Sequence, residues 1–293
     1  TTEIYTLSLH DALPILRTVL ITGGNSGIGK ATVAGLADKG WHVIFTARNK
    51  EKADTVKKEI IDLSNNQNVD YLLADLTSIK QVKECAEAFK NKYQNLDVLI
   101  NNAGVCLPER RITPDGMEES FQINHLSHFI LTNLLIDYLK YSDDPRIINV
   151  SSAAHAAGRF DPDNLQSEKH YSSIRTYADT KLYNILFTLE LAAKLEASGI
   201  KVNVLHPGVV STNFGHEFGG VFNFIYNIGR VIMITPEKGA ATSIYLATSG
   251  EISNVTGKYF IRCRPARLKN PYLTETNRKL LWQKSMELAD LKV

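Results

Sequence analysis

The chain has 293 residues, of which 44% are hydrophobic and 22% charged, and its formal net charge at pH 7 is +2. This size and apolar content suffice for one large α/β domain, and the small net charge argues against nucleic acid as a partner. The three cysteines, Cys85, Cys106 and Cys263, are far apart in the sequence, which argues against a disulfide framework or a zinc site and fits a reducing compartment. No histidine pair has a carboxylate at metal-binding spacing, so we expect no metal.

Residues 1–15 need separate treatment. They show neither helix nor strand periodicity and resemble the in-frame translation of a sequencing-library adapter, so we expect a non-native leader. A natural N-terminal arm is the alternative. We therefore expect a single domain over residues 16–293. The expected location is the cytoplasm, with peripheral or anchored membrane association left open.

Apolar runs and helical patterns alternate from Arg17 onward. Strands are expected at Thr18–Thr22, Trp41–Thr46, Val69–Leu73, Leu96–Asn101, Arg146–Ser151, Ile200–Leu205 and Lys258–Ile261. Helices are expected at Gly27–Lys39, Lys50–Leu63, Ile79–Tyr93, Asp115–Leu139, Ser173–Ser198, Pro236–Thr248 and Glu275–Leu288. This alternation predicts an α/β fold, a Rossmann-type doubly wound parallel sheet of about seven strands with helices on both faces. Such sheets bind ligands beyond the carboxyl ends of their strands.

A glycine-rich turn, Thr22-Gly23-Gly24-Asn25-Ser26-Gly27-Ile28-Gly29-Lys30, joins the first strand to the first helix. Strand, glycine turn and helix together aim backbone N–H groups and the positive helix end at a diphosphate. The spacing T-G-x-x-x-G-x-G resembles that of the short-chain dehydrogenase/reductase family. The candidate cofactor contacts here are Gly23, Asn25, Ser26, Gly27, Ile28 and Gly29.

The residue after the second strand indicates which dinucleotide is bound. Arg48 stands where an acidic residue would bind the ribose of NAD, and a cation there accommodates the 2′-phosphate of NADP. Lys30 adds a second positive charge beside the glycine turn. We therefore expect NADP(H) as cofactor, with a solvated arginine at a helix start as the alternative.

Further cofactor contacts follow from the resemblance. Asp75 and Leu76 resemble the family's adenine-binding pair, although Asp75 could equally be a helix N-cap. The segment after the fourth strand resembles the family's Asn-Asn-Ala-Gly, and the segment after the sixth strand resembles its Pro-Gly segment at the nicotinamide end. These two segments add Asn102, Ala103, Gly104, Pro207, Gly208, Val210 and Thr212. We interpret His206, which precedes the proline, as structural.

The residues of the chemical step follow the fifth strand. Tyr177 and Lys181 are four residues apart, so they share one helix face, and the ammonium is expected to lower the pKa of the phenol from about 10. Such a phenol can give a proton to a carbonyl oxygen. As an isolated pair they would be an ordinary exposed helical pair. The resemblance implies that Tyr177 is the acid/base and that Lys181 also binds the nicotinamide ribose. It further implies that Ser152 binds the substrate oxygen and that Asn124 holds a water of the proton relay.

The Asn149–His155 segment, the Gly257–Phe260 motif and the residues Leu281, Trp282 and Ser285 resemble the retinol dehydrogenase-like branch of the family. The resemblance implies hydride transfer between NADP(H) and a carbonyl/alcohol pair. Residues from about 212 to 235 would form an apolar substrate lid, suggesting a lipophilic substrate such as retinal, and residues 265–293 a C-terminal tail. A helix that packs on the core or on a partner subunit, or that touches a membrane surface, is the alternative for the apolar segment. The alternatives are C=C reduction of a porphyrin-like or enone substrate, or an idle NADP-binding sensor. The two longest helices could form a homodimer or homotetramer interface.

Overall fold

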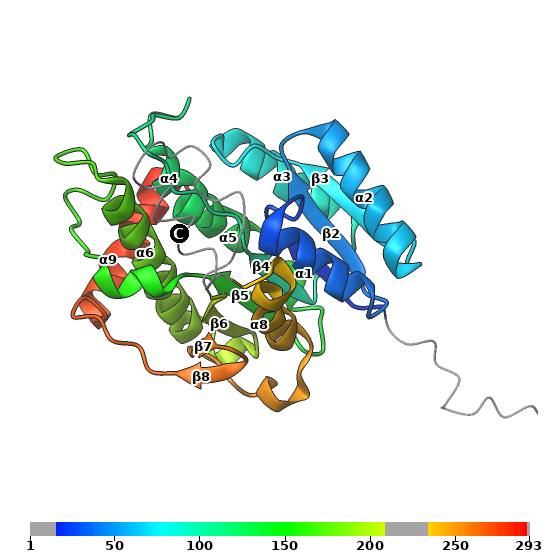
Figure 1. Ribbon diagram of the computed structural model, residues 1–293. Coiled ribbons are helices and arrows are strands. Elements are labelled where there is room, and N and C mark those ends of the chain that lie inside the picture. Colours follow the sequence, from blue (N-terminus) through cyan, green and yellow to red (C-terminus); the bar gives the residue numbers. More distant parts are fainter. Residues whose placement is uncertain (1–15, 209–233, 292–293) are drawn as a thin grey trace, which may run out of the picture.

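The computed structural model describes residues 16–208 and 234–291 (Figure 1). One sheet of eight strands forms the centre of the molecule, in the order β3-β2-β1-β4-β5-β6-β7-β8. The strands are β1 (Thr18–Ile21), β2 (His42–Ala47), β3 (Val69–Leu73), β4 (Val98–Asn101), β5 (Arg146–Val150), β6 (Lys201–His206), β7 (Tyr259–Ile261) and β8 (Arg264–Ala266).

The first seven strands are parallel and confirm the fold predicted from the sequence. Ile21 of β1 pairs with Ile100 of β4, which pairs with Ile148 of β5, so these strands end at one edge of the sheet. Strand order reverses between β1 and β4, where doubly wound sheets open a ligand crevice. The residues that follow β1, β4 and β5 therefore lie together at this carboxyl edge.

The eighth strand was not predicted. β8 pairs antiparallel with β7 through a two-residue turn in which Arg262 and Cys263 both have positive φ values, 50° and 61°. Asn and Gly usually occupy such turns, so Arg-Cys gave no turn signal. Pro265 within β8 also argues against a strand, but this strand lies at the sheet edge, where proline is tolerated.

Helices cover both faces of the sheet. They are α1 (Gly27–Ala37), α2 (Lys50–Ser64), α3 (Ile79–Lys92), α4 (Glu119–Phe121), α5 (Ser127–Leu139), α6 (Ser173–Lys194), α8 (Pro236–Thr248) and α9 (Glu275–Ala289). Buried side chains of α1, α2 and α8 form one apolar cluster with the sheet, and those of α3, α5 and α6 form another. Burial on both faces explains why the strands are continuously apolar rather than alternating.

The expected helix Asp115–Leu139 is interrupted. It begins at Glu119, because the Glu118 carboxylate accepts the N–H groups of Ser120 and Phe121 as a cap. A π-helical segment, Gln122–Leu126, then precedes α5. Such segments have no signature in hydrophobic periodicity, and they are frequent at functional sites. Asn124 lies within it.

The C-terminal helix packs on α5 and α6 (Figure 1). The ring of Trp282 lies 4.9 Å from that of Phe129 and 6.0 Å from that of Phe187, measured between centroids. Ser285 is buried and lies 2.8 Å from Nε2 of His125. α9 therefore covers part of the α5–α6 surface on which an oligomer interface was expected from the sequence.

A charged cluster closes the opposite edge of the sheet, where the strands begin. The Arg146 side chain is only 2% exposed; its Nε donates to Asp144 at 3.0 Å and its Nη1 to the Leu246 carbonyl at 2.8 Å. Arg17 donates to the same carboxylate at 3.1 Å. Pairing and hydrogen bonding offset the cost of burying this guanidinium.

Candidate active site

The glycine turn after β1 is as tight as its sequence predicts. Gly23 and Gly27 have positive φ values, 66° and 51°, which glycine adopts without strain. A Cβ atom at Gly29 would lie 2.2 Å from the Gly23 carbonyl oxygen, so only glycine lets α1 pack directly on the turn. Ser26 precedes α1 without capping it through its side chain, which leaves the first N–H groups of the helix available to an anion. Asn25 and Ile28 are half-buried in the same turn.

The two cations beside the turn differ. Arg48 is exposed directly after β2, where a 2′-phosphate would be met. Lys30, in contrast, forms an ion pair with Glu59 of α2, with Nζ 2.6 Å from Oε2. Lys30 thus lies beside the turn as expected, but Glu59 pairs with its charge, so Arg48 is the better candidate to meet an anion.

The segment after β4 is fastened to the glycine turn by Thr22. The backbone N–H groups of Asn102 and Ala103 donate to Thr22 Oγ1 at 2.9 and 3.0 Å. Asn102 Nδ2 donates to the Thr22 carbonyl at 2.9 Å. The two cofactor motifs found in the sequence thus form one continuous surface.

Asp75 is not the N-cap of α3. Ser78 takes that position and accepts the N–H of Gln81, while the Asp75 carboxylate accepts the N–H and hydroxyl of Thr77 in a local turn. The interpretation of Asp75 as an N-cap is therefore wrong: α3 begins at Ile79, as the sequence predicted, and Ser78 is the residue directly before it. Leu76 is half-buried against the core beside it.

Ser152, Tyr177 and Lys181 come together at the carboxyl edge. Lys181 Nζ lies 5.6 Å from the centroid of the Tyr177 ring and donates to the Val150 carbonyl at 3.1 Å. Burial raises the pKa of Tyr177 to about 12, and a hydrogen bond with Ser152 acts in the opposite direction. Burial lowers the pKa of Lys181 to about 8. The lowering of the Tyr177 pKa by Lys181 that the sequence led us to expect is not found: burial raises this pKa, and the hydrogen bond with Ser152 is what opposes the rise.

Asn124 is fully buried and its side chain is held on both sides. Its Oδ1 accepts the Val105 N–H at 2.7 Å, and its Nδ2 donates to the Val105 carbonyl and to Thr180 Oγ1. A Cβ atom at Gly104 would lie 3.0 Å from Lys181 Nζ and 3.4 Å from Asn124 Oδ1. A side chain at Gly104 would therefore press on both groups, and the second lone pair of Asn124 Oδ1 can still accept a hydrogen bond.

The segment after β6 turns back toward Ser152. His206 Nδ1 accepts the N–H of Ala153 at 3.2 Å and that of Gly208 at 3.4 Å, and burial lowers the pKa of His206 to about 4. These contacts support a structural role for His206. Gly208 has φ +99°, next to Pro207. Val210, Thr212 and nearly all of the expected lid lie outside the described residues.

Two residues beside the site were not selected from the sequence. Thr22 was seen only as the start of the glycine motif, although its hydroxyl joins the two cofactor segments. Cys106 lies next to the site, its Sγ 3.3 Å from Ser173 Oγ, and a charge on this thiol would raise the pKa of both Tyr177 and Lys181. Its position, two residues after the Asn-Asn-Ala-Gly segment, was the only available signal.

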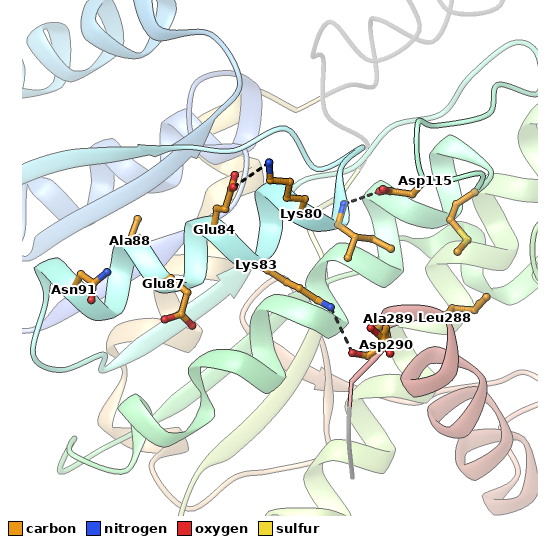
Figure 2. A pocket seen from close by; sticks show the side chains of 12 residues that line it. Lys80, Lys83, Glu84, Glu87, Ala88, Asn91, Asp115, Leu288, Ala289 and Asp290 are labelled. Atoms are coloured by element: carbon orange, nitrogen blue, oxygen red, sulfur yellow. Dashed lines mark hydrogen bonds and ion pairs between the residues drawn. The ribbon is translucent and has the colours of Figure 1, made fainter.

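A surface groove of about 840 Å³ lies away from these residues, between α3 and the end of α9 (Figure 2). Lys83 bridges it by donating to the Asp290 carbonyl at 3.4 Å.

Within residues 16–208 and 234–291, no three His, Cys, Asp or Glu side chains gather as metal ligands would. Among the helices of these two ranges, none is both long and apolar enough to cross a membrane.

The comparison with protein families decides the identity of the fold. The model of the short chain dehydrogenase family matches residues 17–219. This chain belongs to the short-chain dehydrogenase family. It is therefore an oxidoreductase of that family, and the resemblance on which the site was predicted is confirmed.

The similar proteins lie in the expected branch. The chain is 39% identical to human retinol dehydrogenase 13 over 282 residues, covering 94% of this chain and 85% of that protein. It is also 39% identical to human polyprenol dehydrogenase, over 93% of this chain and 85% of the relative.

Solved structures with the same fold are also similar to this chain. A Mycobacterium paratuberculosis protein is 29% identical, with a TM-score of 0.75 over 94% of both chains. Pseudomonas aeruginosa RhlG, solved in an active-site complex with NADP, is 25% identical, with a TM-score of 0.67 over 83% of this chain and 93% of that one.

Proposed function

We propose that this protein is an NADP(H)-dependent oxidoreductase that interconverts a carbonyl and an alcohol on a lipophilic substrate. One observation carries the proposal. A phenol, a hydroxyl and an ammonium, those of Tyr177, Ser152 and Lys181, meet at the sheet edge where the glycine turn lies. This set suits proton transfer to a substrate oxygen beside a dinucleotide.

The residues present fit such a cofactor. Gly23 and Gly29 leave the backbone open where a diphosphate would approach, and the N–H groups of the first turn of α1 have no side-chain cap from Ser26. Arg48 would pair with the 2′-phosphate of NADP, and the NADP complex of the Pseudomonas relative supports this choice over NAD. When bound there, the cofactor supplies the hydride for the carbonyl carbon.

The chain's own residues handle the oxygen and its proton. The Ser152 hydroxyl donates to the substrate oxygen, and Tyr177, neutral because burial raises its pKa, gives that oxygen its proton. The ammonium of Lys181 then stabilises the phenolate that remains. A proton from solvent, passed through a water between Lys181 and Asn124 Oδ1, then reprotonates Tyr177.

Three observations support a lipophilic substrate. The similar human proteins are named retinol and polyprenol dehydrogenases. Ile174, on the first turn of α6 and one turn before Tyr177, is an isoleucine with 62% of its surface exposed. The sequence from 214 to 234 is dominated by Phe, Ile and Val.

All three cysteines are free thiols, which supports our proposal of a reducing compartment such as the cytoplasm.

The test is NADPH and NADH oxidation by the purified protein with a panel of aldehydes and ketones, including all-trans-retinal. We expect turnover of apolar aldehydes with NADPH, and loss of at least about 100-fold in kcat for Tyr177→Phe with NADPH binding kept. Consumption of NADPH only with enones would favour C=C reduction. NADPH binding without turnover of any substrate would favour a sensor.

A further inference from the structure

His128 is a buried imidazole that the proposed mechanism does not use. It lies on the first turn of α5, directly after the π-helical segment, and is 1% exposed. Nε2 lies 2.9 Å from Thr22 Oγ1, and Nδ1 lies 3.1 Å from the backbone carbonyl oxygen of Asn124. One ring therefore touches both the start of the glycine turn and the segment that carries Asn124.

The hydrogen bonds of Thr22 show which nitrogen of the His128 ring carries the proton. Thr22 Oγ1 already accepts two backbone N–H groups, from Asn102 and Ala103. A hydroxyl has two lone pairs and one hydrogen, so this hydrogen is left for Nε2 of His128. Nε2 must then accept, the ring proton is on Nδ1, and Nδ1–H donates to the Asn124 carbonyl.

The His128 ring stays neutral while it forms these two hydrogen bonds. Burial lowers the pKa of His128 to about 3, and the charge of Lys181 acts in the same direction. A protonated ring would carry hydrogen on both nitrogens and would lose the bond from Thr22. Throughout the working pH range of an enzyme, the pattern of donors is therefore fixed.

We propose that His128, as the Nδ1–H tautomer, is a positioning residue that fixes the cofactor half of the site relative to the proton-relay half. The cofactor half is the glycine turn with Asn102 and Ala103, and the other half is Asn124 with Lys181. This inference rests on the proposed function, and it adds a residue that touches neither substrate nor cofactor.

The tautomer is tested directly by NMR of protein labelled with ¹⁵N at histidine. The signals of His128 are assigned by their loss in His128→Phe. We expect a neutral ring with protonated Nδ1 and bare Nε2 from pH 5 to pH 9. A ring protonated on Nε2, or on both nitrogens, overturns the proposal. This measurement needs no turnover, so its outcome does not depend on whether the proposed reaction occurs.

Two substitutions separate the two bonds. Asn133 of the same helix donates from Nδ2 to the carbonyl of Phe129, four residues back, at 2.8 Å. His128→Asn can copy that bond to Asn124 but cannot reach Thr22, whereas His128→Phe loses both. We expect both variants to bind NADPH about tenfold more weakly, and only His128→Phe to lose about tenfold in kcat, each the effect of one buried hydrogen bond.

His125 provides the matched control, because it is equally buried, three residues earlier, and bonded to Ser285 instead of Thr22. Its ring lies among Phe121, Phe129, Tyr183 and Phe187, so His125→Phe suits its surroundings. We expect this variant to keep the NADPH affinity and kcat of the wild type. An equal loss of NADPH affinity and kcat in His125→Phe, or an unchanged affinity and kcat in both His128 variants, overturns the proposal. Wild-type protein that binds NADPH but reduces nothing refutes the proposed function, while the effect on affinity still tests His128.

Discussion

Gly29 lies directly against Gly23: a Cβ atom at Gly29 would lie 2.2 Å from the Gly23 carbonyl oxygen and 2.6 Å from Asn102 Nδ2. The Gly23 backbone is itself held, because its N–H donates to Thr46 Oγ1 at 3.1 Å. Gly29→Ala must therefore displace the turn or the helix. We expect NADPH to bind about 10- to 100-fold more weakly, as measured by fluorescence titration.

Gly35→Ala on the same helix is the control. A Cβ atom there would lie 2.4 Å from Cδ1 of Ile244, the far end of a flexible side chain that can turn away. We expect thermal stability to change while NADPH affinity is retained. A similar loss of affinity in both variants would contradict the assignment of Gly29 to the cofactor turn.

The preference for NADP(H) should depend on Arg48. Arg48→Glu replaces a cation that would pair with the 2′-phosphate by a carboxylate that repels it and can bind a ribose hydroxyl instead. We expect kcat/KM with NADPH to fall about 100-fold and kcat/KM with NADH to be maintained or to rise. Lys52 is also exposed, on the first turn of α2, and Lys52→Glu makes the same change in net charge. We expect Lys52→Glu to leave the ratio of kcat/KM with NADPH to kcat/KM with NADH unchanged.

Reduction should slow in alkali. Burial lowers the pKa of Lys181 to about 8, so its ammonium loses its proton as the pH rises through about 8, and the phenolate of Tyr177 then loses a neighbouring positive charge. Tyr177, whose pKa burial raises to about 12, stays protonated over this range. We expect kcat for reduction, measured at saturating NADPH from pH 6 to pH 10, to fall with a midpoint near 8.

Asp179 supplies the control for that profile. Burial raises the pKa of this carboxyl, between Tyr177 and Lys181 in the sequence, to about 6. Asp179→Asn should keep the midpoint near 8, because the group that titrates there is Lys181. A profile that is flat up to pH 10 in the wild type would count against the charge assigned to Lys181.

Trp282 should stabilise the fold through α9. Its ring packs on Phe129 and Phe187, and Lys194 Nζ lies 4.9 Å from its centroid. We expect Trp282→Ala to lower the free energy of unfolding by about 2 to 3 kcal/mol, less than for a fully buried tryptophan. Gln283→Ala, an exposed neighbour, should change it by less than about 0.5 kcal/mol in the same urea titration. Equal effects would mean that α9 adds little to the core.

Self-association is a second measurement on the same variants. The truncation of Trp282 uncovers apolar rings of α5 and α6, and exposed apolar patches promote association. Sedimentation velocity should show larger species for Trp282→Ala at high concentration than for Gln283→Ala.

Most of the sheet and the glycine turn could be predicted from the sequence, because buried parallel strands are continuous apolar runs and the turn needs glycine at fixed places. β8 could not, since neither Arg262-Cys263 nor Pro265 carries a strand or turn signal. The π-helical segment around Asn124 was also missed, because hydrophobic periodicity does not report one extra residue in a helical turn. The bond between Thr22 and His128 joins residues 106 positions apart, and only the folded chain brings them together.

The buried guanidinium of Arg146 begins the strand that Ser152 follows. Along β5 the two residues are separated by roughly 20 Å, at about 3.3 Å per residue, and within the part of the chain that the structure describes no hydrogen-bond partner is common to both. Effects of substitutions so far apart usually add. Substitutions around Arg17 and Asp144 could thus raise thermal stability, while substitutions at the other end of the same strand change the substrate range. The two effects should add when both sets are introduced into one molecule.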